Sequence, residues 1–203
     1  MNEWKRAAQL PVAFFAQDAV SVARGLLGRV LVTEIRGART AGRIVEVEAY
    51  LGAEDPASHA YRFRRHAQNQ AIYGPPGTWY VYLSYGMHWC ANLVAGPPGQ
   101  GAAVLLRAVE PIDGLSVMRH RRGLEAERLL CAGPGRLTRA LGITRMLNQL
   151  AMRGSKARVL NAPTLRPVDI VAGPRIGISR ATDWPLRFHI RGSPWVSAGR
   201  VER

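Results

Sequence analysis

The alternation of side chains over residues 78–94 is the feature that most restricts how this chain folds. Trp79, Val81 and Leu83 alternate with Tyr80, Tyr82 and Ser84, and the alternation resumes beyond Tyr85 and Gly86. A period of two places the two sets of side chains on opposite faces of a strand. A strand, a Gly-containing turn and a second strand predict a β-hairpin with Tyr85 at or near its tip.

Weaker patterns along the chain predict the other elements. Further strands are expected at residues 29–35, 43–50, 102–108, 169–171, 175–178 and 186–191. Helices are expected at residues 19–27, with Asp18 as N-cap, and at residues 112–122 and 134–141. Strands and helices interleave without regular βαβ spacing, which favours a mixed α+β domain over a doubly wound sheet.

Charge restricts the kind of partner. The 203 residues contain 28 Lys and Arg against 14 Asp and Glu, a formal net charge of +14. Such a surface is typical of proteins that bind nucleic acid, because neutralising phosphates releases counterions. A basic surface without a specific partner is the alternative. Only Lys5 and Lys156 are lysines.

Cysteine and hydropathy patterns point away from several other classes of protein. Cys90 and Cys131 lie in unrelated segments without CxxC spacing, so we expect no disulfide, no metal site and no cofactor. The N-terminus lacks a signal-peptide pattern, and no apolar run reaches the length of a membrane span. We therefore expect a cytoplasmic protein.

Two carboxylates and a phenol share one face of the strand at residues 43–50. Glu46, Glu48 and Tyr50 occur at alternate positions. Neighbouring carboxylates repel each other and raise one pKa, which suits a general base. The alternative is a solvated edge strand, where Glu-x-Glu patterns are common.

A basic segment follows this strand. Arg62, Arg64 and Arg65 alternate with aromatic residues shortly after His59. This composition suits a groove for phosphates and bases, whereas a mobile charged loop is the other interpretation.

Three residues of the central strands raise further questions. A large ring at a hairpin tip, such as Tyr85, can wedge into a duplex and fill the space left by an extruded base. Asn92 lies among apolar neighbours and needs hydrogen-bond partners. Arg107 ends a buried strand and needs a carboxylate partner, for which Glu48 and Glu110 are the candidates.

These residues occur in blocks that resemble the alkyladenine (3-methyladenine) DNA glycosylase family. The blocks are residues 22–28, 46–59, 76–87, 105–111 and 187–197, so the resemblance covers most of the chain. It implies one α+β domain over residues 1–203, with a curved, largely antiparallel sheet, flanking helices and a protruding β-hairpin. Residues 1–15 are expected to be a mobile segment. Residues 145–161 match the family pattern poorly.

The resemblance also implies a role for each site residue. Glu48 would be the general base and Arg107 would help to hold the attacking water. Tyr50, His59 and Tyr82 would enclose the flipped purine, Asn92 would exclude guanine, and Tyr85 would intercalate. Arg62, Arg64 and Arg65 are expected on the DNA backbone.

The expected activity is base excision from damaged double-stranded DNA by a monomeric, nucleoid-associated enzyme of bacterial type. The substrate class would be alkylated or deaminated purines such as 3-methyladenine, 7-methylguanine, hypoxanthine and ethenoadenine. Strand nicking usually needs an amine that forms a Schiff base, and both lysines lie outside the pocket segments, so we expect a monofunctional enzyme. A non-catalytic DNA-binding protein of the same fold, or a different hydrolase using Glu46 and Glu48, are the alternatives.

Overall fold

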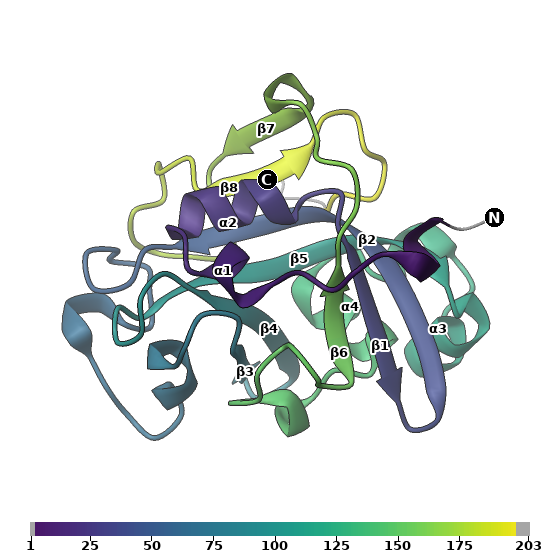
Figure 1. The fold of residues 1–203 in the computed structure, drawn as a ribbon, viewed down its shortest axis with the longest axis horizontal. Coiled ribbons are helices and arrows are strands. Elements are labelled where there is room, and N and C mark those ends of the chain that lie inside the picture. Colours follow the sequence, from purple (N-terminus) through teal and green to yellow (C-terminus); the bar gives the residue numbers. More distant parts are fainter. Residues whose placement is uncertain (1–2, 198–203) are drawn as a thin grey trace.

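The protein is described here from a computed structural model, which covers residues 3–197 (Figure 1). Eight strands form the sheet: β1 Val30–Ile35, β2 Ala38–Tyr50, β3 Trp79–Ser84, β4 His88–Ala95, β5 Ala102–Asp113, β6 Ala157–Leu160, β7 Ile170–Gly173 and β8 Arg187–Ile190. Four α-helices accompany them: α1 Val12–Phe15, α2 Ala19–Leu26, α3 Leu115–Arg122 and α4 Pro134–Leu141. Short 3₁₀ helices are η1 Glu3–Arg6, η2 Tyr61–Phe63, η3 Gln70–Tyr73, η4 Glu127–Leu129, η5 Arg145–Leu147 and η6 Pro167–Asp169.

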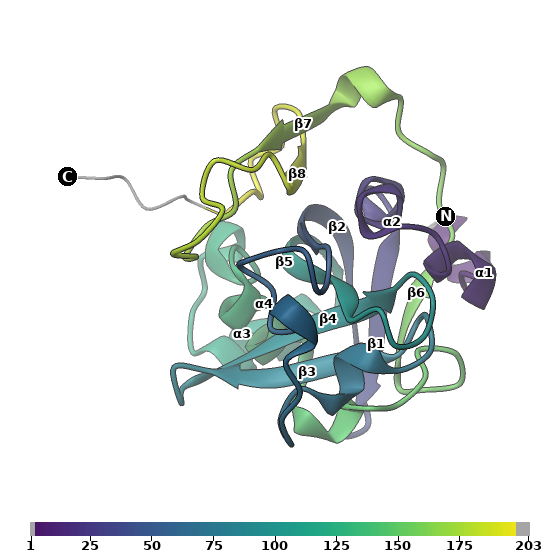
Figure 2. The same ribbon diagram turned by 90° about the vertical axis from the view of Figure 1, so that its left-hand side faces the viewer.

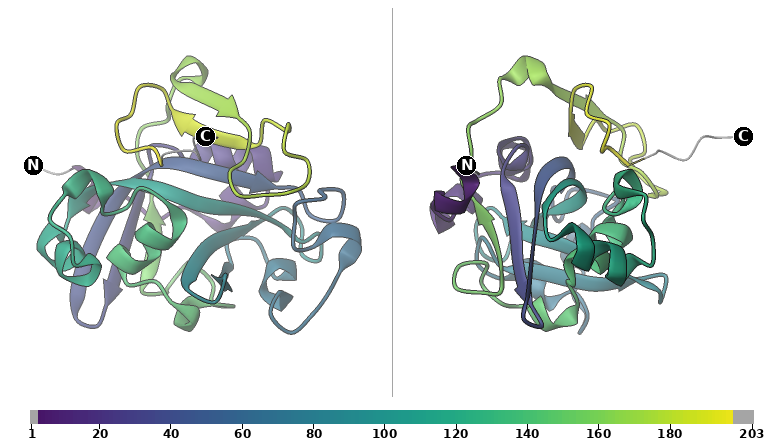
Figure 3. Two further views of the ribbon diagram at one scale, coloured as in Figure 1. Left: turned by 180° about the vertical axis from the view of Figure 1, so that it is seen from behind. Right: turned by 90° about the vertical axis from the view of Figure 1, so that its right-hand side faces the viewer.

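The sheet is curled, and each strand pairing within it is antiparallel, in the order β3-β4-β5-β2-β1-β6. Strand β2 is long enough to pair with two strands along one edge. Its first half pairs with β1, and residues Glu46, Val47 and Glu48 pair with β8. β8 in turn pairs with β7, and this two-stranded arm lies beside α2 (Figures 1 and 3). The predicted α+β class is confirmed.

Irregularities in the pairing of β2 with β5 bend the sheet where the candidate residues lie. The register shifts between Ala41 and Gly42 and on both sides of Glu46. Bulges of this kind bend a strand and re-aim side chains. At Gly42 a Cβ atom would stand 2.5 Å from a methyl of Val109, so the close approach of the two strands requires glycine.

The helices cover the sheet with apolar faces, as their sequences predict. Helix α2 begins at Asp18, whose carboxylate accepts hydrogen bonds from the backbone N–H groups of Val20 and Ser21. Its buried residues include Val22 and Leu26. Helix α4 has the predicted bounds and starts at Pro134. It ends at Leu141, and the next residue, Gly142, adopts the left-handed conformation.

The N-terminal residues differ from the expected mobile segment. Leu10 is 3% exposed and Phe15 is fully buried in the main core. Gln9 forms an isolated bridge with Leu160 of β6. Apolar burial thus fixes this segment against the sheet from residue 9 onward. No helix within residues 3–197 has the length and hydropathy needed to cross a membrane.

One predicted strand is absent and several predicted bounds are wrong, most of all the start of β2, which lies at Ala38 rather than at residue 43. Residues 175–178 form an irregular segment rather than a strand, because Pro174 and Gly177 interrupt any regular pairing. Strand β5 continues through Ile112 and Asp113, so α3 starts only at Leu115. The turn between them is Gly114, with φ 75°, where a Cβ atom would stand 2.4 Å from the carbonyl oxygen of Arg39.

The predicted hairpin is present and projects from the body of the protein (Figure 2). Tyr85 lies in its turn, with φ 50°, and is 84% exposed. Gly86 follows with φ 68°, which glycine adopts without strain. The turn therefore presents the Tyr85 ring to solvent.

Candidate active site

Cross-strand neighbours bring four side chains from four strands into one row. Tyr80 on β3 faces Asn92 on β4, and Asn92 faces Leu105 on β5. Leu105 in turn faces Glu48 on β2. Directly opposed residues of neighbouring strands share one face of the sheet, so the row runs across a single face.

A hollow of about 1260 Å³ lies over this face. Its aromatic lining comes from the strands and from the loop after β2: Tyr50, His59, Tyr61, Tyr80, Tyr82, Tyr85 and Trp89. Asn92, Leu105, Arg107 and the segment 176–180 complete the floor and one wall. Glu48 itself has 0% exposure and lies beneath this floor. The hollow can therefore accommodate a planar ring between aromatic side chains, above a buried carboxylate.

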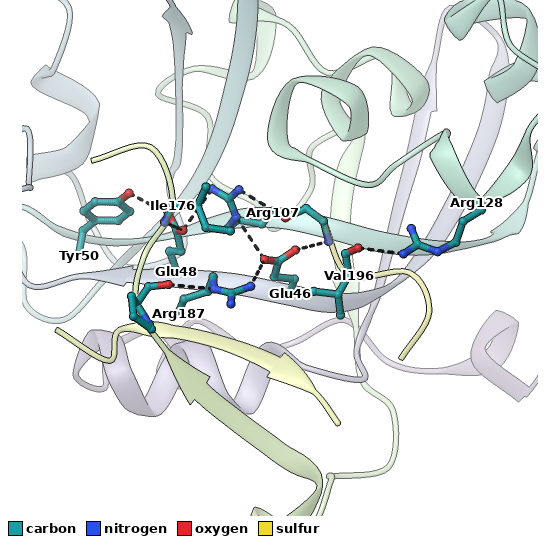
Figure 4. Close-up of polar contacts among 10 residues, drawn as sticks. Glu46, Glu48, Tyr50, Arg107, Arg128, Ile176, Arg187 and Val196 are labelled. Atoms are coloured by element: carbon teal, nitrogen blue, oxygen red, sulfur yellow. Dashed lines mark hydrogen bonds and ion pairs between the residues drawn. The ribbon is translucent and has the colours of Figure 1, made fainter. Parts of the chain in front are cut away.

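Glu48 is held by three donors (Figure 4). The phenol of Tyr50 donates to Oε2 at 2.9 Å, and the backbone N–H of Ile176 donates to Oε1 at 2.8 Å. The Nη1 atom of Arg107 lies 3.1 Å from Oε1. These contacts fix both carboxylate oxygens.

Burial and these donors act in opposite directions on Glu48. Desolvation is the largest effect and raises the pKa of the carboxyl group above its usual value, while Arg107, Ile176 and Tyr50 oppose the rise. The negative charge of Glu46 contributes a smaller increase in this pKa. The phenol pKa of Tyr50 is raised well above 10 by burial and by Glu48, so Tyr50 stays a donor.

Glu46 is the centre of a second set of contacts in Figure 4. Its Oε1 atom lies 2.9 Å from Nη1 of Arg187 and 3.4 Å from Nε of Arg107. Its Oε2 atom accepts the backbone N–H of Ser197 at 2.7 Å. Glu46 is fully buried, as Glu48 is, which excludes the solvated-edge interpretation of the Glu-x-Glu pattern. β2 is an interior strand with β5 on one edge and β1 and β8 on the other.

Arg107 joins the two carboxylates. It is 6% exposed and contacts Glu46 and Glu48, and its Nη2 atom lies 3.4 Å from Oγ of Ser197. Of the two predicted partners, Glu48 is confirmed, whereas Glu110 pairs with Arg43. Two buried carboxylates are thus matched by two guanidinium groups, from Arg107 and Arg187.

His59 and two tyrosines form an aromatic wall. Nδ1 of His59 lies 2.6 Å from the Tyr80 hydroxyl, and the His59 ring meets the Tyr82 ring edge-on at 4.5 Å. Tyr80 and Tyr82 are stacked with their centroids 5.3 Å apart. His59 lines the hollow. Partial burial of the imidazole, and to a smaller extent the nearby His66, lower the pKa of His59, which favours the neutral ring.

Tyr50 is backed by a buried ion pair. The Arg175 guanidinium lies over the Tyr50 ring, 4.7 Å from its centroid. Both Arg175 and Asp55 are fully buried on the side chain, with 2.8 Å between Nη2 and Oδ1. Asp55 also accepts the backbone N–H groups of Leu51 and Ala57. This pair therefore links the loop after β2 to the segment that carries Ile176.

Asn92 is 4% exposed and lines the hollow. Its Nδ2 atom donates to the carbonyl oxygen of Tyr80 at 3.0 Å. This bond answers the predicted need for a partner and fixes the orientation of the amide.

The predicted DNA-contacting residues form an exposed set, here called the rim, of which two members line the hollow. Tyr85 and Arg64 line the hollow, and Arg62, Arg64 and Arg65 are all exposed. Arg62 and Arg65 lie over the rings of Tyr61 and Tyr73. Neither lysine lines the hollow, and residues 3–197 contain no cluster of His, Cys, Asp and Glu suited to a metal.

Several site residues were missed by reasoning from sequence. Ile176 contributes only its backbone N–H, which no side-chain pattern reveals. Arg187 and Ser197 reach Glu46 over sequence separations of 141 and 151 residues. The one available signal was the alternation at residues 186–191, which predicted β8 and hence a strand that could pair with β2.

Comparison with known proteins identifies the family. The family model described as Methylpurine-DNA glycosylase (MPG) matches residues 13–194. A protein of Methanoculleus marisnigri named "Putative 3-methyladenine DNA glycosylase" is 49% identical over 93% of this chain and 98% of its own length. Proteins with the same name from Nitrosospira multiformis and Rhodopseudomonas palustris are 49% and 47% identical, over 92% and 95% of this chain and 93% and 92% of their own lengths. This chain belongs to the methylpurine-DNA glycosylase family.

Proposed function

We propose that this DNA glycosylase flips alkylated or deaminated purines out of duplex DNA and hydrolyses their N-glycosidic bond with a water activated by Glu48. The observation that carries the proposal is the fully buried, triply held carboxylate beneath an aromatic hollow. Burial makes Glu48 a stronger base, and its three donors keep the ionised form accessible.

One acceptor position of Glu48 is available for water. A carboxylate has about four lone-pair positions. Within the described residues, Ile176 and Arg107 occupy those of Oε1, and Tyr50 occupies one on Oε2. The remaining position on Oε2 can accept a proton from a water molecule near the floor. Loss of a purine develops positive charge on the sugar, which the same carboxylate would stabilise.

The walls suit a flipped purine. Tyr50, His59 and Tyr82 line the hollow with aromatic rings, which attract electron-poor alkylated bases. The Tyr80 phenol would donate to Nδ1 of His59. The imidazole proton would then be on Nε2, which could donate a hydrogen bond to the substrate. The fixed amide of Asn92 would crowd the 2-amino group of normal guanine.

We expect base release without strand cleavage. A Schiff base needs an amine, and among the described residues no lysine lines the hollow. We expect a monomeric enzyme that inserts Tyr85 into the space of the extruded base.

The test is release of free base from duplexes carrying each of the four lesions, with and without alkali. We expect release with an intact strand, cut only by alkali. Glu48→Gln should lower the single-turnover rate by about a hundredfold to ten-thousandfold without weakening binding to lesion DNA. Glu34→Gln, at an exposed ion pair with Arg158, is the matched control. Undiminished release by Glu48→Gln would refute the proposal.

A further inference from the structure

The loop that follows His59 contains an exposed aromatic ring on strained backbone. Phe63 is 64% exposed, and its φ angle is 58°. Arg62 precedes it with φ 54°. The left-handed region is unfavourable for a residue with a side chain, and such strain collects at functional sites where the surrounding structure enforces it.

The surrounding structure does enforce this conformation. The N–H groups of Arg62 and Phe63 donate to the carbonyl oxygens of Ala53 and Ala60 at 2.9 Å. The carbonyl oxygen of Arg64 accepts from Nδ2 of Asn69 and from the hydroxyl of Tyr73, at 2.9 and 2.7 Å. Asn69 is fully buried and also donates to the carbonyl oxygen of His59. The loop is therefore fastened to the pocket wall on both sides of Phe63.

Phe63 lies in a basic segment of the chain. Tyr61 and Tyr73 each have an arginine over the ring, whereas Phe63 faces solvent. The exposed Arg62, Arg64 and Arg65 flank it in the sequence, and Arg64 lines the hollow that Tyr85 also lines. An exposed aromatic ring flanked by arginines is the arrangement that binds phosphates and base faces together.

We propose that Phe63 is a second DNA-contacting ring, which stacks against a nucleotide of the duplex beside the flipped one. This inference rests on the proposed function, since it names a contact of the same DNA substrate. The arginines supply phosphate contacts, and the strained backbone holds the ring outward before DNA arrives. Preorganised presentation lowers the ordering cost of binding.

The test measures affinity for a duplex with a tetrahydrofuran abasic site, using Phe63→Tyr, Phe63→Ala and Phe63→Gly. Phe63→Ala keeps the strain and removes the ring, whereas Phe63→Gly removes both. We expect Phe63→Tyr to bind as the parent protein does, and the other two variants to bind about tenfold more weakly. Val168→Ala, at a 62% exposed residue of η6, is the control and should leave the affinity unchanged.

Two further measurements separate stacking from other causes. Phe63→Gly should unfold at a higher temperature than Phe63→Ala, because glycine tolerates the positive φ angle. The dependence of affinity on salt should be unchanged in all three variants, since no phosphate contact is lost. Parent-like affinity of both Phe63→Ala and Phe63→Gly, or an equal loss in Phe63→Tyr, would overturn the inference. Base release by the parent protein, assayed in parallel on a hypoxanthine duplex, reports separately on the proposed function.

Discussion

Charged side chains are arranged differently in two regions of the molecule. In the region of Glu46 and Glu48, here called the buried floor, they are paired away from solvent, whereas in the exposed region of Phe63 and Tyr85, the rim, they are solvated. On the floor, two carboxylates face two guanidinium groups, with the carboxylates wholly removed from solvent. On the rim, the guanidinium groups of Arg62, Arg64 and Arg65 are exposed. Matched buried charges depend on exact partners, whereas solvated charges interact weakly and diffusely. We expect the buried residues to affect chemistry and the exposed residues to affect DNA binding, with different sizes of effect.

The largest expected effect is that of Glu46→Gln on the floor. It leaves Arg187 without its buried counter-charge and Arg107 with that of Glu48 alone, so the free energy of unfolding should fall by about 3 kcal/mol. We also expect slower base release, because Arg107 then interacts with Glu48 alone. Urea denaturation and single-turnover rates measure the two effects. Glu110→Gln on β5 removes an exposed ion pair with Arg43 of β2. It should lower the free energy of unfolding by less than about 1 kcal/mol. Equal losses in the two variants would abolish the distinction between buried and exposed ion pairs.

The pH dependence of base release is the next largest effect. Glu48 acts as a base only when ionised, and its pKa is raised by burial. The rate on a neutral lesion such as hypoxanthine should therefore fall about tenfold per pH unit as the pH drops below this raised pKa. In Glu46→Gln the acidic limb should move to lower pH, because Glu46 contributes to the increase. An acidic limb that stays in place would show that the two carboxylates do not interact.

On the rim, Tyr85→Ser should weaken binding to lesion duplex by about tenfold, the effect of one lost aromatic stack. The reason is that the 84% exposed ring would no longer fill the space of the extruded base. Fluorescence of ethenoadenine reports flipping, and equilibrium titration reports affinity. The unfolding temperature should not change. If Tyr85→Ser instead lowered the rate of base release and retained the affinity, Tyr85 would act in the chemical step rather than in binding.

The smallest expected effect is that of Arg64→Gln. Loss of one phosphate contact should weaken binding a few-fold for all sequences and reduce the salt slope by about 1. Affinity measured over a series of salt concentrations tests this. Arg166→Gln, at the arginine that precedes η6 and pairs with Asp169, provides the comparison and should leave the slope unchanged. An unaltered slope in Arg64→Gln would remove this arginine from the DNA interface.

Local signals in the sequence predicted the regular elements well. Asp18 and Gly142 mark the start of α2 and the end of α4 through capping, which involves neighbours in the sequence. The alternation at residues 78–94 predicted the hairpin and its exposed Tyr85 because a period of two and a glycine turn are local properties. Residues 175–178 were predicted wrongly because their alternation was weighed above the interruption by Pro174 and Gly177.

The candidate site was predicted only in part. Apolar neighbours indicated that Asn92 and Arg107 need partners, yet alternation alone could not place β2 inside the sheet. The burial of Glu46 and Glu48 depends on β8 and on the C-terminal segment, which reach β2 from far along the chain. The periodicity of a sequence does not indicate which distant segments pair with a given strand. The proposed roles of Glu48, Tyr50, His59, Tyr82 and Asn92 stay predictions.

The bond from the Ser197 backbone to Glu46 has a consequence for synthesis of the enzyme on the ribosome. A nascent chain that has emerged through β5 already holds Glu46, Glu48 and Arg107. It still lacks Ile176, Arg187 and Ser197, which complete their coordination. The sheet can thus begin to assemble once β5 has emerged, while the contacts of Glu46 are complete only after Ser197 has emerged. A product that stops before residue 197 would present the exposed arginines without the full set of contacts to Glu46 and Glu48.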